Sequence, residues 1–187
     1  MIATLRTKRL ALRPICADDI SAFVPLLDDF DVVKNLTHVP HPYTVADGRA
    51  FIARTEQKRR EGLSLNYAVL LDGETFIGFC TANIEDENGE RHPGSRELGY
   101  WYGKPFWGRG YATEAAQAVV EYAFDQLGAA ALTSGVYVDN PASLRVLKKL
   151  GFWETGIAER NCVSRGTIVI AHEVLLTREA FAGRARA

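Results

Sequence analysis

The sequence predicts an α+β fold in which a mixed, mostly antiparallel sheet of six to seven strands is flanked by helices. The spacing of apolar residues orders the elements as strand, two helices, three strands, helix, strand, helix and two strands. Asp72-Gly73 separates two strand-like runs and is a strong signal for a β-hairpin. Because three strands follow one another without intervening helices, most of the strand pairing should be antiparallel.

The N-terminal half contains an opening strand, two helices and the hairpin. Acidic residues precede the first helical stripe, and two prolines interrupt the chain after that helix. The expected segments are a strand over 4–14, a helix that starts at 17–19, a loop or broken helix over 31–43, a helix over 45–60 and hairpin strands over 63–71 and 75–84.

The C-terminal half is organised around a glycine-rich turn between a strand and a long amphipathic helix. From Ala116 the apolar residues recur with helical spacing, and Gly128 follows them as a stop signal. The expected segments are a polar loop over 86–95, a strand over 97–102, the turn over 107–112, a helix to 127, a strand over 132–138, a helix over 141–150, two strands within 153–176 joined over 161–166, and a final helix over 178–187.

Composition indicates a soluble intracellular protein of one domain, spanning residues 1–187. The hydrophobic share of 47% and the charged share of 24% are ordinary for a globular chain. The net charge of -1 implies no general attraction to nucleic acid or to anionic membranes. No apolar segment has the length of a signal peptide core or a membrane span, so we expect a cytoplasmic location.

The cysteines and histidines do not have the spacing of a metal site. Cys16, Cys80 and Cys162 are far apart and form no C-x-x-C pair, which suits a reducing compartment. The four histidines likewise lack ligand spacing, so we expect no metal; they are His38, His41, His92 and His172.

The turn Trp107-Gly108-Arg109-Gly110 predicts an anion site. Glycines let the backbone approach a ligand, and the first helical turn exposes N–H groups at the positive end of the helix dipole. A phosphate or pyrophosphate is therefore the favoured ligand, although two glycines can also serve only to make a tight turn. Thr113 takes the third small position of the dinucleotide pattern G-x-G-x-x-G/A, and the strand context differs, so a dehydrogenase is disfavoured.

Three stretches together resemble a known family. ELGYW with WGRGYATEA, followed by VDNPASLRVLKKLGF, resembles motifs A and B of the GNAT acetyltransferases. T-x-R-L-x-L-R-P over 7–14 and Pro-Tyr-Thr over 42–44 resemble the branch of ribosomal-protein alanine N-acetyltransferases. The resemblance covers nearly the whole chain, and its strongest part runs from 97 to 152.

This resemblance implies acetyl-CoA as cosubstrate and a GNAT-like fold. The family pattern [QR]-x-x-G-x-[GA] falls on 107–112, where Trp107 replaces the usual Gln or Arg. The backbone of the turn would hold the pyrophosphate, and the strand before it would pair with pantetheine. The implied cofactor-binding residues are Gly99, Tyr100, Trp101, Tyr102, Trp107, Gly108, Arg109, Gly110, Tyr111, Ala112, Thr113, Asn140 and Ser143.

The resemblance also implies catalytic roles for Glu97 and Ser143. Glu97 would deprotonate the attacking ammonium, directly or through water, because an amine must lose its proton before it attacks a thioester; its alternative is a solvent-facing strand residue. Ser143 would meet the departing sulfur, or is a plain first-turn serine. Asn140 would bind the cofactor, or cap the helix before Pro141. Leu147 stands where many GNAT enzymes have a tyrosine.

The expected function is transfer of an acetyl group from acetyl-CoA to a primary amine in a ternary complex. A protein N-terminus is the favoured acceptor, and a polyamine, amino acid or drug-like amine is the alternative. A non-catalytic acyl-CoA sensor is a further alternative. We expect a monomer or homodimer, and no nucleic-acid or membrane partner.

Overall fold

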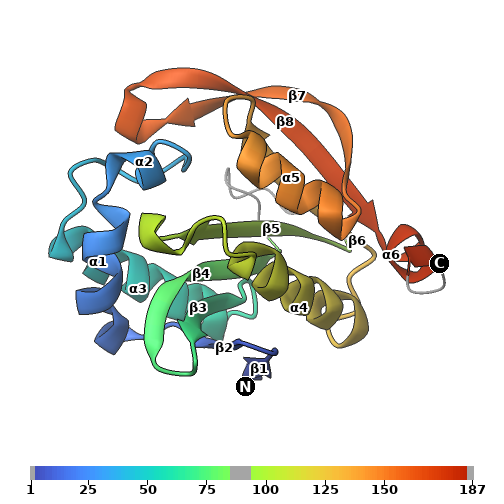
Figure 1. Ribbon diagram of the computed structural model, residues 1–187, viewed down its shortest axis with the longest axis horizontal. Coiled ribbons are helices and arrows are strands. Elements are labelled where there is room, and N and C mark those ends of the chain that lie inside the picture. The colour runs from blue at the N-terminus through green and yellow to red at the C-terminus, as the bar shows by residue number, and fades with distance from the viewer. Residues whose placement is uncertain (1–2, 85–93, 185–187) are drawn as a thin grey trace.

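The computed structural model describes residues 3–84 and 94–184, which form one eight-stranded sheet with helices on both faces (Figure 1). The strand order is β1-β2-β3-β4-β5-β6-β8-β7. Of these neighbours only β5 and β6 run parallel in the described residues, and the remaining pairs are antiparallel. The predicted α+β class and mixed sheet are therefore confirmed. Most of the loop expected over 86–95 lies outside the described residues, and so does His92.

The elements agree closely with the segments expected from the sequence. The strands are β1 (Leu5–Arg6), β2 (Leu10–Pro14), β3 (Asn66–Leu71), β4 (Thr75–Asn83), β5 (Ser95–Tyr102), β6 (Ala131–Tyr137), β7 (Trp153–Cys162) and β8 (Thr167–Thr177). The helices are α1 (Ile20–Leu27), α2 (Phe30–Val33), α3 (Val45–Arg60), α4 (Tyr111–Asp125), α5 (Pro141–Leu150) and α6 (Arg178–Arg184). None of the helices in the described part could cross a membrane.

The sheet has eight strands rather than six to seven because the opening segment folds into two. The backbone N–H of Thr7 donates to the carbonyl of Leu10 at 2.9 Å, which closes a turn between β1 and β2. Leu5 then pairs with Leu12, and β2 pairs with β3 on its other edge. The turn places the residues from Thr7 to Arg9 against the first turn of α4.

The predicted hairpin is present at Asp72-Gly73. Both residues have positive φ, 51° and 82°, and the backbone N–H of Glu74 donates to the carbonyl of Leu71 at 3.1 Å, which closes the turn. The turn joins β3 to β4 in antiparallel register. These two strands supply the centre of the sheet, where most side chains are buried on both faces.

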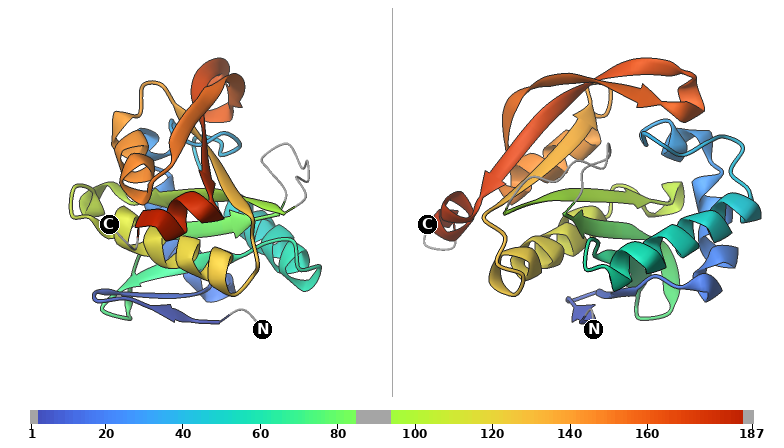
Figure 2. Two further views of the ribbon diagram at one scale, coloured as in Figure 1. Left: turned by 90° about the vertical axis from the view of Figure 1, so that its right-hand side faces the viewer. Right: turned by 180° about the vertical axis from the view of Figure 1, so that it is seen from behind.

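Two apolar clusters cover the two faces of the sheet. Val119, Val120 and Phe124 of α4 pack with Leu147 and Leu150 of α5 on one face. The other face is covered by α1 and α3, as the two views of Figure 2 show. Because helices cover both sides, the core strands are rich in apolar residues throughout.

β5 and β6 are neighbours for only three residues of each strand. Their parallel register runs from Ser95 opposite Ala131 to Glu97 opposite Thr133. Beyond these pairs β5 continues to Tyr102 and β6 to Tyr137 on separate paths (Figure 1). The sheet therefore opens between β5 and β6, and backbone groups of β5 face the gap.

Candidate active site

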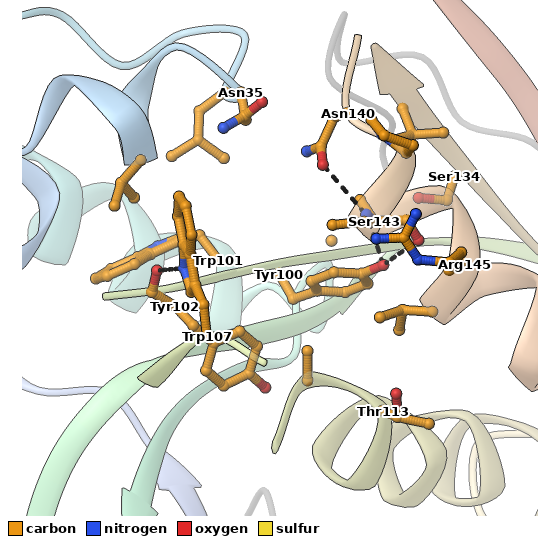
Figure 3. Close-up of a pocket in the computed structure, with 18 of the residues that line it drawn as sticks. Asn35, Tyr100, Trp101, Tyr102, Trp107, Thr113, Ser134, Asn140, Ser143 and Arg145 are labelled. Carbon is orange, nitrogen blue, oxygen red and sulfur yellow. Dashed lines mark hydrogen bonds between the residues drawn. The ribbon is translucent and has the colours of Figure 1, made fainter. Parts of the chain in front are cut away.

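A cavity of about 660 Å³ lies where β5 and β6 separate (Figure 3). Its walls come from β5, the glycine turn, the start of α5 and α2. Both predicted catalytic residues, Glu97 and Ser143, line it. So do all but one of the predicted cofactor residues: Gly99, Tyr100, Trp101, Tyr102, Trp107, Gly108, Gly110, Tyr111, Ala112, Thr113, Asn140 and Ser143.

Arg109 is the exception among the predicted residues. Its side chain is exposed, and its backbone carbonyl accepts a hydrogen bond from Arg9 at 3.0 Å. Arg109 thus belongs to the outer side of the turn. The contribution to cofactor binding expected of Arg109 is that of a backbone N–H group.

The glycine turn has the conformation that an anion site needs. Gly108 and Gly110 have φ of 74° and 80°. This left-handed backbone conformation is strained for residues that carry a side chain. No side chain of the described residues caps α4, which begins at Tyr111 directly after the turn. The N–H groups of its first turn thus remain open to a ligand at the positive end of the helix dipole. This backbone fits a pyrophosphate.

Trp107 fastens the turn to the end of β5. Its indole Nε1 donates a hydrogen bond to the carbonyl of Tyr102 at 2.6 Å (Figure 3). The ring is 44% exposed, so the tryptophan also contributes an apolar edge to the cavity. Trp107, which replaces the Gln or Arg of the family pattern, therefore holds the backbone of the turn against β5.

Successive residues of β5 face opposite sides of the sheet. Leu98 and Tyr102 are buried in the cluster with α4 and α5, and Tyr100 packs against it. Trp101 packs against the cluster of α1 and α3, and strand alternation puts Glu97 on its side. The cavity is consequently lined by side chains from both faces of β5, one beside α4 and α5 and the other beside α1 and α3.

On the α5 side, Tyr100, Ser143 and Asn140 form a connected group. The phenolic oxygen of Tyr100 lies 2.9 Å from the hydroxyl of Ser143. Asn140 Oδ1 accepts from the backbone N–H of Ser143 at 3.1 Å, so Asn140 caps α5 while its amide lies at the cavity. Burial raises the pKa of Tyr100 far above its usual value, although the hydrogen bond with Ser143 opposes this. Tyr100 therefore keeps its proton at neutral pH.

Leu147 does not face the cavity. It is fully buried in the α4–α5 cluster, and the lining of the cavity on this helix comes from other positions, including Ser143 and Val146. The phenol next to Ser143 comes instead from Tyr100 on β5. A tyrosine is thus present at the site although the helix carries none.

On the opposite side, Glu97 lies beside Arg160 of β7. Arg160 Nη1 is 3.7 Å from Glu97 Oε1, and both side chains are largely buried, at 14% and 19% exposure. Arg160 also donates from Nε and Nη2 to Glu173 Oε1 at 3.0 and 2.7 Å. Gly135 of β6 permits this packing, because a Cβ there would lie 2.5 Å from Arg160 Cζ. Glu97 is therefore not a solvent-facing strand residue.

Arg160 is a site residue that sequence reasoning missed. The signal for it was Gly135, since an isolated glycine within a strand often marks the close approach of another group. Ser134 was also missed; its hydroxyl donates to the carbonyl of Leu98 at 2.8 Å, just beyond the last β5–β6 pair. It closes the inner end of the gap between the strands.

The described residues contain no group of three or more His, Cys, Asp or Glu side chains that could hold a metal ion. The cysteines are free thiols, and Cys80 and Cys162 are buried. Burial raises the pKa of Cys80 to about 12, which keeps it a protonated, unreactive thiol.

Comparisons with known proteins agree with this geometry. The family model of the acetyltransferase (GNAT) domain matches residues 9–153. The Probable N-acetyltransferase YjcK of Bacillus subtilis is 41% identical over 174 residues, which are 91% of this chain and 94% of YjcK.

Two solved structures share the fold. RimJ of Mycobacterium smegmatis in complex with CoA-disulfide superposes with a TM-score of 0.80 at 23% identity, over 91% of this chain and 82% of RimJ. The ribosomal-protein-S5-alanine acetyltransferase of Vibrio fischeri gives a TM-score of 0.81 at 15% identity, over 96% and 99%. On the family match and the identity to YjcK, the chain belongs to the GNAT family of acetyltransferases and is an N-acetyltransferase.

Proposed function

We propose that this protein transfers the acetyl group of acetyl-CoA directly to a primary amine, and that the amine is the N-terminus of a protein. The observation that carries the proposal is the single cavity that joins the glycine turn to Glu97 across the open edge of β5. The CoA bound to RimJ and the alanine acceptor named for the Vibrio fischeri enzyme, which has the same fold, support it.

Acetyl-CoA would supply an activated acetyl thioester. The backbone N–H groups of the turn from Gly108 to Thr113 would hold its pyrophosphate, because the left-handed glycines and the start of α4 turn donors toward an anion. The backbone of β5 from Gly99 to Tyr102 is paired with β4 on one edge only. Apart from the Tyr102 carbonyl, which accepts from Trp107, its other edge is available to pair with the pantetheine arm.

The two faces of β5 would divide the chemistry. Glu97 would accept the proton of the incoming ammonium, directly or through one water. Ser143 would donate a hydrogen bond to the departing sulfur. Tyr100, held in its protonated form, lies 2.9 Å from the hydroxyl and 3.2 Å from the backbone carbonyl of Ser143. Donation to the hydroxyl would leave the serine proton directed at the sulfur. Much of the rate would come from holding amine and thioester together.

A calorimetric titration with acetyl-CoA, beside desulfo-CoA and NAD, tests the first part of the proposal. We expect micromolar binding of acetyl-CoA and no binding of NAD. Failure of acetyl-CoA to bind would refute both the transferase and a CoA sensor.

Mass spectrometry then tests the acceptor. A peptide with a free N-terminal alanine should gain one acetyl group, and the same peptide with a blocked N-terminus should gain none. Acetylation of spermine or of free amino acids in place of the peptide would transfer the assignment to a small-molecule enzyme. Binding of acetyl-CoA without acetylation of any amine would indicate a non-catalytic acyl-CoA sensor.

A further inference from the structure

The turn between β1 and β2 is hydrogen-bonded to the first turn of α4. The hydroxyl of Thr7 donates to Glu114 Oε1 at 2.6 Å, and the backbone N–H of Arg9 donates to the same oxygen at 2.9 Å. Arg9 Nε and Nη2 contact Glu114 Oε2 at 2.7 and 2.6 Å. One carboxylate thus receives four contacts from a segment more than a hundred residues away in the chain.

Arg9 also lies against the glycine turn itself, beside three successive residues. Its Nη1 donates to the carbonyl of Arg109 at 3.0 Å. Its Nη2 lies 3.5 Å from the position that a Cβ of Gly110 would occupy, and its Cζ lies 4.5 Å from the centre of the Tyr111 ring. Because a trans peptide directs its C=O and N–H to opposite sides, holding this carbonyl turns the N–H of Gly110 away from Arg9.

The charge of Glu114 requires such a partner if the turn is to bind an anion. Its carboxylate sits in the first turn of α4, where it would repel a neighbouring pyrophosphate. Burial acts to raise the pKa of Glu114, but hydrogen bonds from Thr7 and Arg9 outweigh it and lower the pKa overall. The group therefore remains ionised, and the guanidinium of Arg9 offsets its charge at contact distance.

We propose that Arg9 is a positioning residue for cosubstrate binding: through Glu114 and Arg109 it holds the glycine turn in its anion-binding conformation. The inference rests on the proposed function, since the anion is the pyrophosphate of acetyl-CoA. Neither Arg9 nor Glu114 lines the cavity. Arg9 thus acts through the turn and not by touching the ligand.

Arg9→Gln tests the proposal, with Lys8→Gln as the matched control. Lys8 is the exposed neighbour of Arg9, and its replacement changes the net charge by the same amount. We expect the Kd of CoA to rise about tenfold, or ~1.4 kcal/mol, in Arg9→Gln and to stay within about twofold in Lys8→Gln. Arg9→Lys, which keeps the charge but not the planar fork, should fall between them.

A second substrate separates positioning from general damage to the fold. S-acetylpantetheine carries the thioester but no pyrophosphate, so Arg9→Gln should raise the KM of acetyl-CoA and leave kcat/KM for S-acetylpantetheine as in the wild type. Arg9→Lys should show the same split in smaller measure, and it serves as the test if Arg9→Gln folds poorly.

Three results would overturn the inference. CoA affinity in Arg9→Gln and Arg9→Lys equal to the wild type would show that the turn does not need Arg9 to hold its conformation. Equal losses with acetyl-CoA and S-acetylpantetheine would assign Arg9 a purely structural role. Failure of the wild type to bind CoA would refute the proposed function, and this inference with it.

Discussion

Gly135→Ala should displace Arg160 and so disturb the side of the cavity that carries Glu97. A Cβ at this position would lie 2.5 Å from Arg160 Cζ and 2.7 and 2.8 Å from Nη2 and Nε. Non-bonded carbon atoms settle at about 3.5 Å or more, so the guanidinium must move by about 1 Å. The backbone of β6 cannot yield instead, because β8 pairs with it throughout.

The displacement breaks the bonds that hold Arg160. Its two hydrogen bonds to Glu173, at 3.0 and 2.7 Å, would lengthen beyond hydrogen-bonding distance. Such charged bonds contribute ~1.5–3 kcal/mol when shielded, and Glu173 is partly exposed, so we expect the free energy of unfolding to fall by about 1 to 2 kcal/mol. Misplacement by 1 Å next to Glu97 should lower kcat/KM for the amine roughly a hundredfold.

Urea unfolding and steady-state kinetics measure both effects. Gly156→Ala is the matched control, because this exposed glycine of β7 has no atom within 4 Å of its Cβ position and no positive φ. In an Arg160→Ala background the cost of Gly135→Ala should largely vanish, since the clashing group is gone. Stability and activity of Gly135→Ala equal to those of Gly156→Ala would contradict this prediction. A loss of stability on Gly135→Ala that persists in the Arg160→Ala background would contradict it as well.

Three further substitutions probe other contacts. Glu97→Gln should keep the Kd of acetyl-CoA within about twofold and lower kcat by about a hundredfold or more, measured by calorimetry beside a CoA-release assay; equal turnover would remove Glu97 as the base. Tyr100→Phe removes the phenol bonded to Ser143 and should lower kcat about fivefold to tenfold at unchanged KM for acetyl-CoA; a change in KM alone would contradict this. Asp19→Asn tests an ion pair with Arg13 in which burial acts to raise the pKa of Asp19 but hydrogen bonds from Arg13 lower it overall. A lowered pKa stabilises the fold above the ordinary value of 3.8 and loses this effect as the pH falls. The stability difference between wild type and Asp19→Asn in urea should thus shrink from about pH 5 downward; a constant difference would exclude the linkage.

Elements with chemical signals at both ends were predictable from the sequence. α3 begins after Thr44, whose side chain and that of Asp47 cap each other's backbone N–H groups. α5 has its cap at Asn140 with proline next, and it ends before Gly151 at φ 95°. These signals act within a few residues, so the observed bounds match the expected ones.

Features that depend on the pairing of distant strands were not predictable. The turn at Thr7 to Arg9 contains no glycine, proline or asparagine, so its split of the opening strand had no local signal. Arg160 of β7 reaches Glu97 of β5 past Glu173 of β8 and Gly135 of β6, so the contact joins strands that are not neighbours in the sheet. The meeting of Tyr100 with Ser143 likewise joins two elements 43 residues apart in the chain. Periodicity describes each element separately and is silent on these encounters.

The alternation of side chains along β5 has a consequence for altering the enzyme's selectivity. The two ligands would share the backbone of this strand but not its side chains, because odd-numbered residues face the α1–α3 layer and even-numbered residues face α4 and α5. Substitutions at Trp101 should therefore change the acceptor preference more than the coenzyme affinity, whereas Gly99 leaves little room for a side chain, because a Cβ there would lie 3.0 Å from Thr81 Cγ2. Substitutions at Tyr100 and Tyr102 should reshape the coenzyme side and leave the acceptor spectrum as it is.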